Sequence, residues 1–165
     1  MAPRVIPTEP FDLVIFGGTG DLARRKILPG LYRRFQAGQM TADSRIIGAA
    51  RGDLTDADFR EFVRKAVEEF IPSGRWDEAS LAGFLAQLHF VPIDAKGTAG
   101  WPALKSLMRP GVVRAFYFSV APSLFGDLAE RLHSHAIADD QSRIVVEKPF
   151  GRDLATAQAL NAVLA

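Results

Sequence analysis

The chain has 165 residues, of which 48% are hydrophobic and 24% are charged, and its formal net charge is +1. This composition is ordinary for a soluble globular protein, and the length corresponds to about one domain, so we expect residues 1–165 to form a single domain. The balanced charge provides no overall electrostatic field that would attract nucleic acid or an anionic membrane. The absence of cysteine excludes disulfide scaffolds, cysteine-based zinc sites and cysteine nucleophiles.

Short apolar segments alternate with amphipathic ones along the chain. The apolar segments predict strands over 11–16, 45–50, 89–93, 112–119 and 143–147. The amphipathic segments predict helices over 21–36, 55–70, 76–87, 102–108, 122–136 and from 153 onward. This alternation predicts an α/β fold, a Rossmann-like doubly wound parallel sheet in strand order 3-2-1-4-5 with helices on both faces. Because the strands are almost continuously apolar, we expect both of their faces to be buried.

The sequence shows no targeting or membrane segment. Residues 1–10 contain three prolines and one arginine and no long apolar core, unlike a signal peptide. No run approaches the 18 or so apolar residues of a membrane helix. A cytoplasmic location, with neither membrane nor nucleic acid as a partner, is therefore the simplest expectation.

A glycine-rich turn joins the first predicted strand to the first predicted helix, in the pattern G-x-x-G-x-x-A. Glycine lets the backbone turn tightly and approach a pyrophosphate, and the helix start adds unsatisfied N–H groups. We therefore predict dinucleotide binding by Gly17, Gly18, Thr19, Gly20, Asp21, Leu22 and Ala23. The alternative is a glycine-rich turn without a ligand, and the carboxylate of Asp21 is an awkward neighbour for a pyrophosphate.

The second predicted strand is followed by Arg51, where this fold holds the adenosine ribose. An acidic residue at this point suits the 2′-hydroxyl of NAD, whereas arginine suits the 2′-phosphate of NADP. The position and the missing acid favour NADP, although a solvated loop arginine is the alternative. Phosphate-loop ATPases are disfavoured because Gly-Lys-Ser/Thr is absent. Short-chain epimerases need Tyr and Lys four residues apart, but Gln36 follows Tyr32 and Ala121 follows Tyr117 at that spacing.

Three segments resemble the glucose-6-phosphate dehydrogenase family. They are residues 12–26 (DLVIFGGTGDLARRK), residues 45–48 with Arg51 just beyond, and residues 143–154 (RIVVEKPFGRDL). The likeness extends over about residues 11–165, and separated motifs in the same order are specific. Membership implies oxidation of the C1 hydroxyl of glucose 6-phosphate to a lactone, with hydride passed to NADP.

The resemblance also implies roles for individual residues at the cofactor. The loop from Gly17 to Ala23 would hold the pyrophosphate, and Thr19 and Arg51 would contact the 2′-phosphate. Asp94 and Ala95, after the third strand, would lie near the adenosine.

Further implied roles concern the substrate. Lys148 would lie between nicotinamide and sugar phosphate, with Pro149 in the cis form shaping that junction, and Lys26 would approach the active site. Without the resemblance, Lys148 would be interpreted as a surface loop lysine and Lys26 as a solvated helix residue.

The chain departs from the family in lacking the Asp-His pair whose histidine is the general base. His89 lies in a predicted strand and reads as structural, while His133 and His135 do not converge on a metal, so no metal site is expected. The last helical pattern also has no stop signal. We therefore expect the N-terminal, cofactor-binding portion of a longer, two-domain, homo-oligomeric enzyme that acts on glucose 6-phosphate. We expect this portion to be inactive by itself. The alternative is a non-catalytic NADP-binding or regulatory module.

Overall fold

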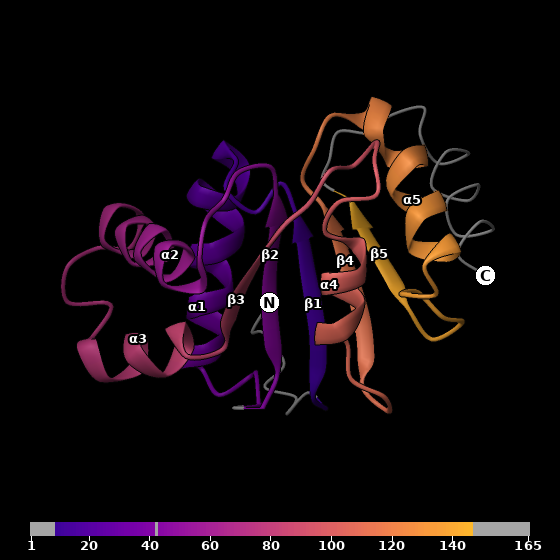
Figure 1. Cartoon of the computed structure of the whole chain (residues 1–165). Helices are drawn as coiled ribbons and strands as arrows, with labels where there is room; N and C mark the ends of the chain where they lie inside the picture. The colour runs from indigo at the N-terminus through magenta and orange to yellow at the C-terminus, as the bar shows by residue number, and fades with distance from the viewer. Residues whose placement is uncertain (1–8, 42, 147–165) are drawn as a thin grey trace.

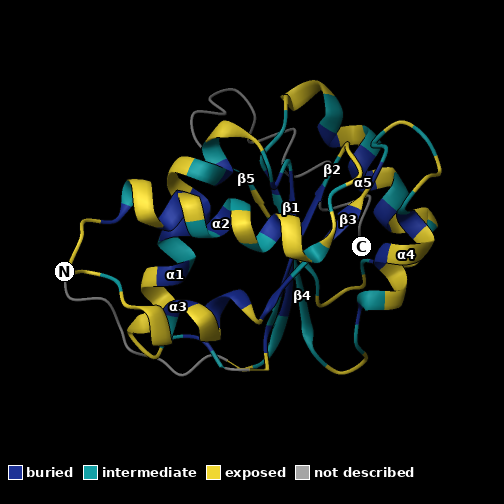
Figure 2. Cartoon of the chain, turned by 60° about the vertical axis from the view of Figure 1, so that its left-hand side comes forward, coloured by how far each residue is buried: buried dark blue, intermediate teal, exposed yellow. Residues whose placement is uncertain are grey.

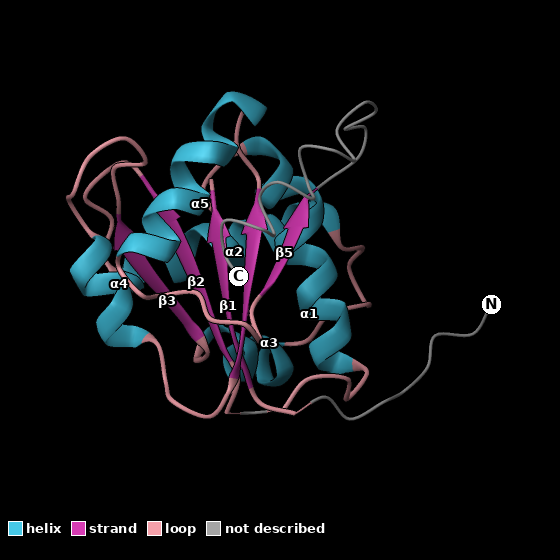
Figure 3. Cartoon of the chain, turned by 90° about the vertical axis from the view of Figure 1, so that its right-hand side faces the viewer, coloured by secondary structure: helices cyan, strands magenta, loops and turns pink. Residues whose placement is uncertain are grey.

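The computed structural model describes residues 9–41 and 43–146, which build a five-stranded parallel sheet between layers of helices (Figure 1). The strands are β1 (Phe11–Phe16), β2 (Arg45–Ala50), β3 (Leu88–Pro92), β4 (Val113–Phe118) and β5 (Arg143–Val146). Their order is β3-β2-β1-β4-β5, and every neighbouring pair is parallel. The predicted fold class and strand order are confirmed. All strand arrows point to the same edge of the sheet in Figure 3.

The helices follow the predicted segments with small shifts at their ends. They are α1 (Leu28–Gln36), α2 (Asp56–Phe70), α3 (Glu78–Leu85), α4 (Trp101–Leu107) and α5 (Phe125–Ser134). A π-helical turn, η1 (Ala23–Ile27), precedes α1, and a 3₁₀ turn, η2 (Pro122–Leu124), precedes α5. The helix predicted from residue 153 lies outside the described residues.

The start of α2 shows why local sequence patterns placed these elements well. The hydroxyl of Thr55 accepts a hydrogen bond from the backbone N–H of Asp58, and the Asp58 carboxylate accepts one from the N–H of Thr55. This capping box satisfies two N–H groups that the helix itself cannot pair.

Two apolar layers sandwich the sheet, because alternate side chains of each strand point to opposite faces. On one face α1, α2 and α3 pack over Leu13 and Ile15 of β1. On the other face α4 and α5 pack over Val14 and Phe16. Figure 2 shows the buried residues concentrated along the strands and the inner sides of the helices.

The expectation that every strand is buried on both faces is wrong for the β4–β5 side of the sheet. Ile144 and Val146 pack against the core beneath α5, but Val145 on the opposite face is 41% exposed. Its neighbours on that face, Ala115 and Tyr117 of β4, are only partly buried. The reason is that, within the described residues, α1–α3 lie over β1–β3 and leave this side of β5 uncovered.

Candidate functional site

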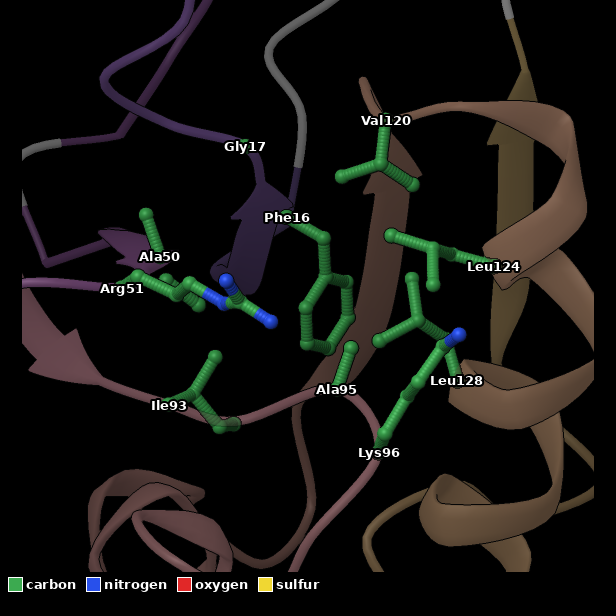
Figure 4. Close-up of a pocket in the computed structure, with 11 residues that line it drawn as sticks. Phe16, Gly17, Ala50, Arg51, Ile93, Ala95, Lys96, Val120, Leu124 and Leu128 are labelled. Atoms are coloured by element: carbon green, nitrogen blue, oxygen red, sulfur yellow. The ribbon is translucent and has the colours of Figure 1, made fainter.

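A cavity of about 220 Å³ opens at the carboxyl edge of the sheet (Figure 4). Its walls are mainly apolar and come from the ends of β1 to β3 and from the segment after β4: Phe16, Gly17, Ala49, Ala50, Arg51, Ile93, Ala95, Lys96, Val120, Leu124 and Leu128. In open parallel sheets, ligands bind at this edge, where the strand order reverses. The cavity is therefore the candidate functional site.

The glycine-rich loop passes so close to other backbone that its first two positions have no room for side chains. Gly17 has φ +81°, and a Cβ there would lie 2.1 Å from the carbonyl oxygen of Ser119. A Cβ on Gly18 would lie 2.8 Å from the Cα of Gly48 in β2. The N–H of Gly17 donates to the carbonyl of Ala49 over 2.8 Å, which ties the loop to the end of β2.

The loop leads directly into the first helical segment. The N–H of Gly20 donates to the carbonyl of Gly17 over 2.9 Å, and the N–H of Arg24 donates to the carbonyl of Gly20 over 3.0 Å. Ala23 is fully buried, as expected for a small residue where helix and sheet pack closely. Thr19 makes no hydrogen bond within the described part of the chain. Of the predicted loop residues, Gly17 lines the cavity and the others lie outside its walls.

Two arginines neutralise Asp21 beside this loop. Arg25 Nε lies 2.9 Å from one carboxylate oxygen, and Arg24 Nη2 lies 3.1 Å from the other. Hydrogen bonds from Arg25 and Arg24 hold the pKa of Asp21 below its usual value. Arg24 also bonds to Glu69 of α2 over 2.5 Å. The negative charge that seemed awkward in the sequence is thus compensated within the protein.

Two predicted basic residues reach the site or its surroundings without partners. Arg51 lines the cavity from the end of β2 and has no ion pair or hydrogen bond within residues 9–41 and 43–146. Lys26 lies in the π-helical turn after the glycine loop, is exposed, and likewise has no partner among those residues. Lys148 and Pro149 lie outside the described residues.

The segment after β3 contributes Ala95 to the cavity as predicted, but Asp94 supports the loop and is not part of the wall. The Asp94 carboxylate accepts a hydrogen bond from the N–H of Lys96, and its carbonyl accepts one from the indole of Trp101. Lys96 itself lines the cavity, and sequence reasoning missed it. Its position two residues beyond Asp94, after a strand's carboxyl end, was the available signal.

The opposite wall of the cavity was also missed. It is formed by Val120, Leu124 and Leu128, from the end of β4 to the first turns of α5. The sequence pattern placed Leu124 and Leu128 in the helix predicted over 122–136 and Val120 just before it, but did not connect them with the cofactor site. The carboxyl end of a strand beside β1 was again the available signal.

Two of the three histidines, His89 and His135, have structural surroundings. His89 lies in β3 with Nδ1 3.4 Å from the Asp56 carboxylate, and the ring of His135 stacks on Trp101 with centroids 5.8 Å apart. Within the part of the chain that the structure describes, no three His, Cys, Asp or Glu side chains gather into a possible metal site. The same part contains no helix long and apolar enough to cross a bilayer.

Comparison with known proteins identifies the family of this fold and loop. Residues 14–165 match the family model described as "Glucose-6-phosphate dehydrogenase, NAD binding domain". The chain belongs to this family. Membership supports a nicotinamide dinucleotide as the cofactor.

Similar proteins agree in sequence and in structure. The chain is 48% identical to the glucose-6-phosphate 1-dehydrogenase of Rhizobium meliloti, over 98% of this chain and 33% of the relative. It is 45% identical to the enzyme of Gluconobacter oxydans, over 93% and 32%. The crystal structure of the enzyme from Mycobacterium avium superposes with a TM-score of 0.80 at 32% identity, over 94% of this chain and 33% of that one. A second structure, "Glucose-6-phosphate dehydrogenase in complex with its substrate glucose-6-phosphate", gives a TM-score of 0.77 at 30% identity, over 100% and 35%.

The chain thus spans about a third of the length of the relatives that it matches. A single domain over residues 1–165, a cytoplasmic location and homo-oligomeric assembly of the intact enzyme stay predictions.

Proposed function

We propose that this chain binds NADP as the cofactor-binding part of a glucose-6-phosphate dehydrogenase. The enzyme would oxidise glucose 6-phosphate to 6-phosphogluconolactone and pass hydride to NADP. The observation that carries this proposal is the apolar cavity at the carboxyl edge, flanked by the glycine loop and lined by an arginine that has no partner among the described residues. The names of the relatives and the solved substrate complex support the reaction.

The cavity and the loop fit different parts of a dinucleotide. A volume of about 220 Å³ is below the ~300–1,000 Å³ of pockets that enclose a whole ligand. It suits one part, and the apolar side chains around it suit a purine ring. The missing side chains at Gly17 and Gly18 leave backbone for the pyrophosphate to approach, beside the start of the first helix.

Arg51 is the residue that would select NADP over NAD. Its guanidinium presents a planar fork that matches phosphate oxygens, and no carboxylate within the described residues already compensates its charge. Thr19, whose hydroxyl has no partner there, would add a hydrogen bond to the same 2′-phosphate.

The substrate side of the proposal rests on the family resemblance. The bound nicotinamide would accept the hydride from the C1 carbon. Lys148 would hold the sugar phosphate or its hydroxyl at the cofactor, Pro149 in the cis form would shape that junction, and Lys26 would extend toward the same place. The catalytic histidine of the family has no counterpart among residues 1–165, as the absence of an Asp-His pair shows.

The cofactor assignment is tested by titrating the protein with NADP and with NAD in a calorimeter. Replacing Arg51 with alanine removes charge-assisted hydrogen bonds of about 1.5–3 kcal/mol, so NADP binding should weaken roughly ten- to hundred-fold. NAD binding should change little, because NAD has no 2′-phosphate. Arg75→Ala, at an exposed loop arginine remote from the cavity walls, is the matched control. An equal loss for both cofactors would contradict the assignment of Arg51.

A second experiment tests the division of labour between this part and the rest of the enzyme. Proton removal from the sugar hydroxyl needs a base within hydrogen-bond reach, and residues 1–165 contain no such assigned base. We expect no NADPH production from glucose 6-phosphate by these residues alone, measured by absorbance with purified protein. Lys148→Ala excludes contaminating host enzyme, and turnover that depends on Lys148 would show that the catalytic base lies within this chain.

A further inference from the structure

The loop between β3 and α4 is fixed by hydrogen bonds of its own backbone. The N–H of Asp94 donates to the carbonyl of Ala99 over 3.1 Å, and the N–H of Gly97 donates to the carbonyl of Asp94 over 3.2 Å. The N–H of Lys96 donates to the Asp94 carboxylate over 3.0 Å. The backbone of Lys96 is therefore held at a defined place.

Two helices anchor the same loop from outside. The indole Nε1 of Trp101, a fully buried residue at the start of α4, donates to the carbonyl of Asp94 over 2.9 Å. Arg131 of α5 donates from Nε to the carbonyl of Gly97 over 2.8 Å. Lys96 is itself exposed, but its backbone belongs to a loop that α4 and α5 hold in place.

The side chain of Lys96 has no hydrogen bond or ion pair within residues 9–41 and 43–146, although it lines the cavity. In Figure 4, Arg51 enters from the end of β2 and Lys96 from the loop after β3, with the apolar side chains of Phe16, Ala95 and Leu128 between them. The cavity therefore has a cation toward each end. Neither positive charge is paired with a carboxylate in the part of the chain that the structure describes.

We propose that Lys96 recognises the adenine base of the cofactor, by donating to an acceptor nitrogen at the edge of the ring remote from Arg51. This inference rests on the proposed function and assigns it a further specificity-determining residue. Arg51 would distinguish cofactors by the ribose phosphate, whereas Lys96 would act on the base, which NADP and NAD share.

The chemistry of the two partners agrees with this assignment. A lysine ammonium has three donors and no acceptor, and the ring nitrogens of adenine are acceptors. The apolar residues between the two cations would cover the faces of the adenine ring. A ring nitrogen at the edge nearest Lys96 would accept a hydrogen bond from its ammonium group. A phosphate bound by Arg51 would lie at the other end of the cavity.

The test uses Lys96→Met, which keeps much of the aliphatic chain and removes the donors. Binding of NADP, NAD, AMP and nicotinamide mononucleotide is measured by calorimetry. We expect about three- to tenfold weaker binding of NADP, NAD and AMP by the variant, and unchanged binding of nicotinamide mononucleotide. AMP and nicotinamide mononucleotide each carry one 5′-phosphate, so a difference between them isolates the base. Lys105→Met, at an exposed lysine of α4 outside the cavity walls, should bind all four ligands like the wild type.

Three results would overturn the proposal in distinguishable ways. Unchanged binding of NADP and NAD by Lys96→Met would remove Lys96 from the site while leaving the proposed function intact. A loss confined to NADP would place Lys96 at the 2′-phosphate and refute its contact with the base. Failure of the wild-type protein to bind either dinucleotide would overturn the proposed function and this inference together. A thermal melt of both variants confirms that the fold is retained.

Discussion

The two ends of the parallel sheet use basic side chains in opposite ways. At the amino end, Arg109 surrounds the fully buried Asp12 of β1, with Nε and Nη2 at 2.9 and 2.6 Å from Oδ1 and its backbone N–H at 2.9 Å from Oδ2. Its remaining nitrogen donates to the carbonyl of Asp43 over 2.6 Å. Arg45 and Arg114 at the same end donate to the carbonyls of Leu107 and Ile137.

At the carboxyl end, Arg51 and Lys96 line the cavity without a partner in the described part of the chain. Both ends therefore place cations over strand termini, but the side chains of Arg51 and Lys96, unlike that of Arg109, make no hydrogen bond within the described part of the chain. The comparison teaches that partners, more than residue type, separate a structural arginine from one that is free for a ligand. It also predicts that the two ends respond differently to substitution.

The largest effect should come from the amino end, by replacing Asp12 with alanine. This change leaves the guanidinium of Arg109, only 24% exposed, without its carboxylate. Removing one partner of a buried ion pair is strongly destabilising, so we expect a loss of about 3 kcal/mol in the free energy of unfolding, measured by urea denaturation.

The double variant Asp12→Ala/Arg109→Met sharpens this prediction. Because it removes both charges, it should recover part of the stability lost in the single variant. NADP binding by whichever variant remains folded should match the wild type, since the pair lies at the far end of the sheet from the cavity. A cost below about 1 kcal/mol for Asp12→Ala would show that the pair is not a structural anchor.

The next largest loss of stability should come from adding a side chain to the glycine loop at the carboxyl end of the sheet. Gly17 and Gly38 both have positive φ, of +81° and +74°, but an added Cβ meets the Ser119 carbonyl only at Gly17 and finds nothing within 4 Å at Gly38. Gly38→Ala should therefore cost about 1 kcal/mol from backbone strain alone. Gly17→Ala should cost about 2 kcal/mol or more and also weaken NADP binding. Equal thermal shifts for the two variants would contradict the close approach at Gly17.

A smaller effect on stability is expected at Arg51, although its effect on binding is large. The side chain has no partner within the described residues, so Arg51→Ala should change the free energy of unfolding by no more than about 0.5 kcal/mol. Chemical denaturation without cofactor measures this, and adding NADP should stabilise the wild type more than the variant. A large intrinsic loss would mean that Arg51 is structural, like Arg109.

Sequence patterns predicted the parts of this fold that depend on neighbours in the chain. The capping box of Thr55 and Asp58 spans three residues, and the turn from Gly17 to Ala23 follows directly from its glycines. The strand order followed from the alternation of strands and helices, read as a doubly wound dinucleotide-binding fold, together with the handedness of βαβ units. These features need no knowledge of distant contacts.

The features that sequence reasoning missed depend on residues far apart. The sequence analysis assigned no role to Asp12, because its partner Arg109 is 97 positions away. The place of Lys96 in the cavity depends on Trp101 and Arg131, which fix its loop from two helices. The exposed face of Val145 likewise depends on which strands the helices cover, and the apolar pattern of a strand does not contain that information.

The smallest effect should come from Asp21, the exposed carboxylate beside the glycine loop. Because Arg25 and Arg24 lower its pKa in the folded protein, its pairing contributes stability above the pKa of the unfolded chain, near 3.8, and loses that contribution as the pH falls through the folded value. Asp21→Asn should thus melt slightly below the wild type at pH 7, and the difference should shrink as the pH is lowered below about 4. Asp140→Asn, at an exposed carboxylate in the turn before β5 with no ion pair within residues 9–41 and 43–146, should match the wild type throughout. A gap that persists in acid would mean that Asp21 acts through its shape at the helix start and not through its charge. Neutralisation by the two arginines would then no longer explain how a carboxylate is tolerated beside the proposed pyrophosphate site.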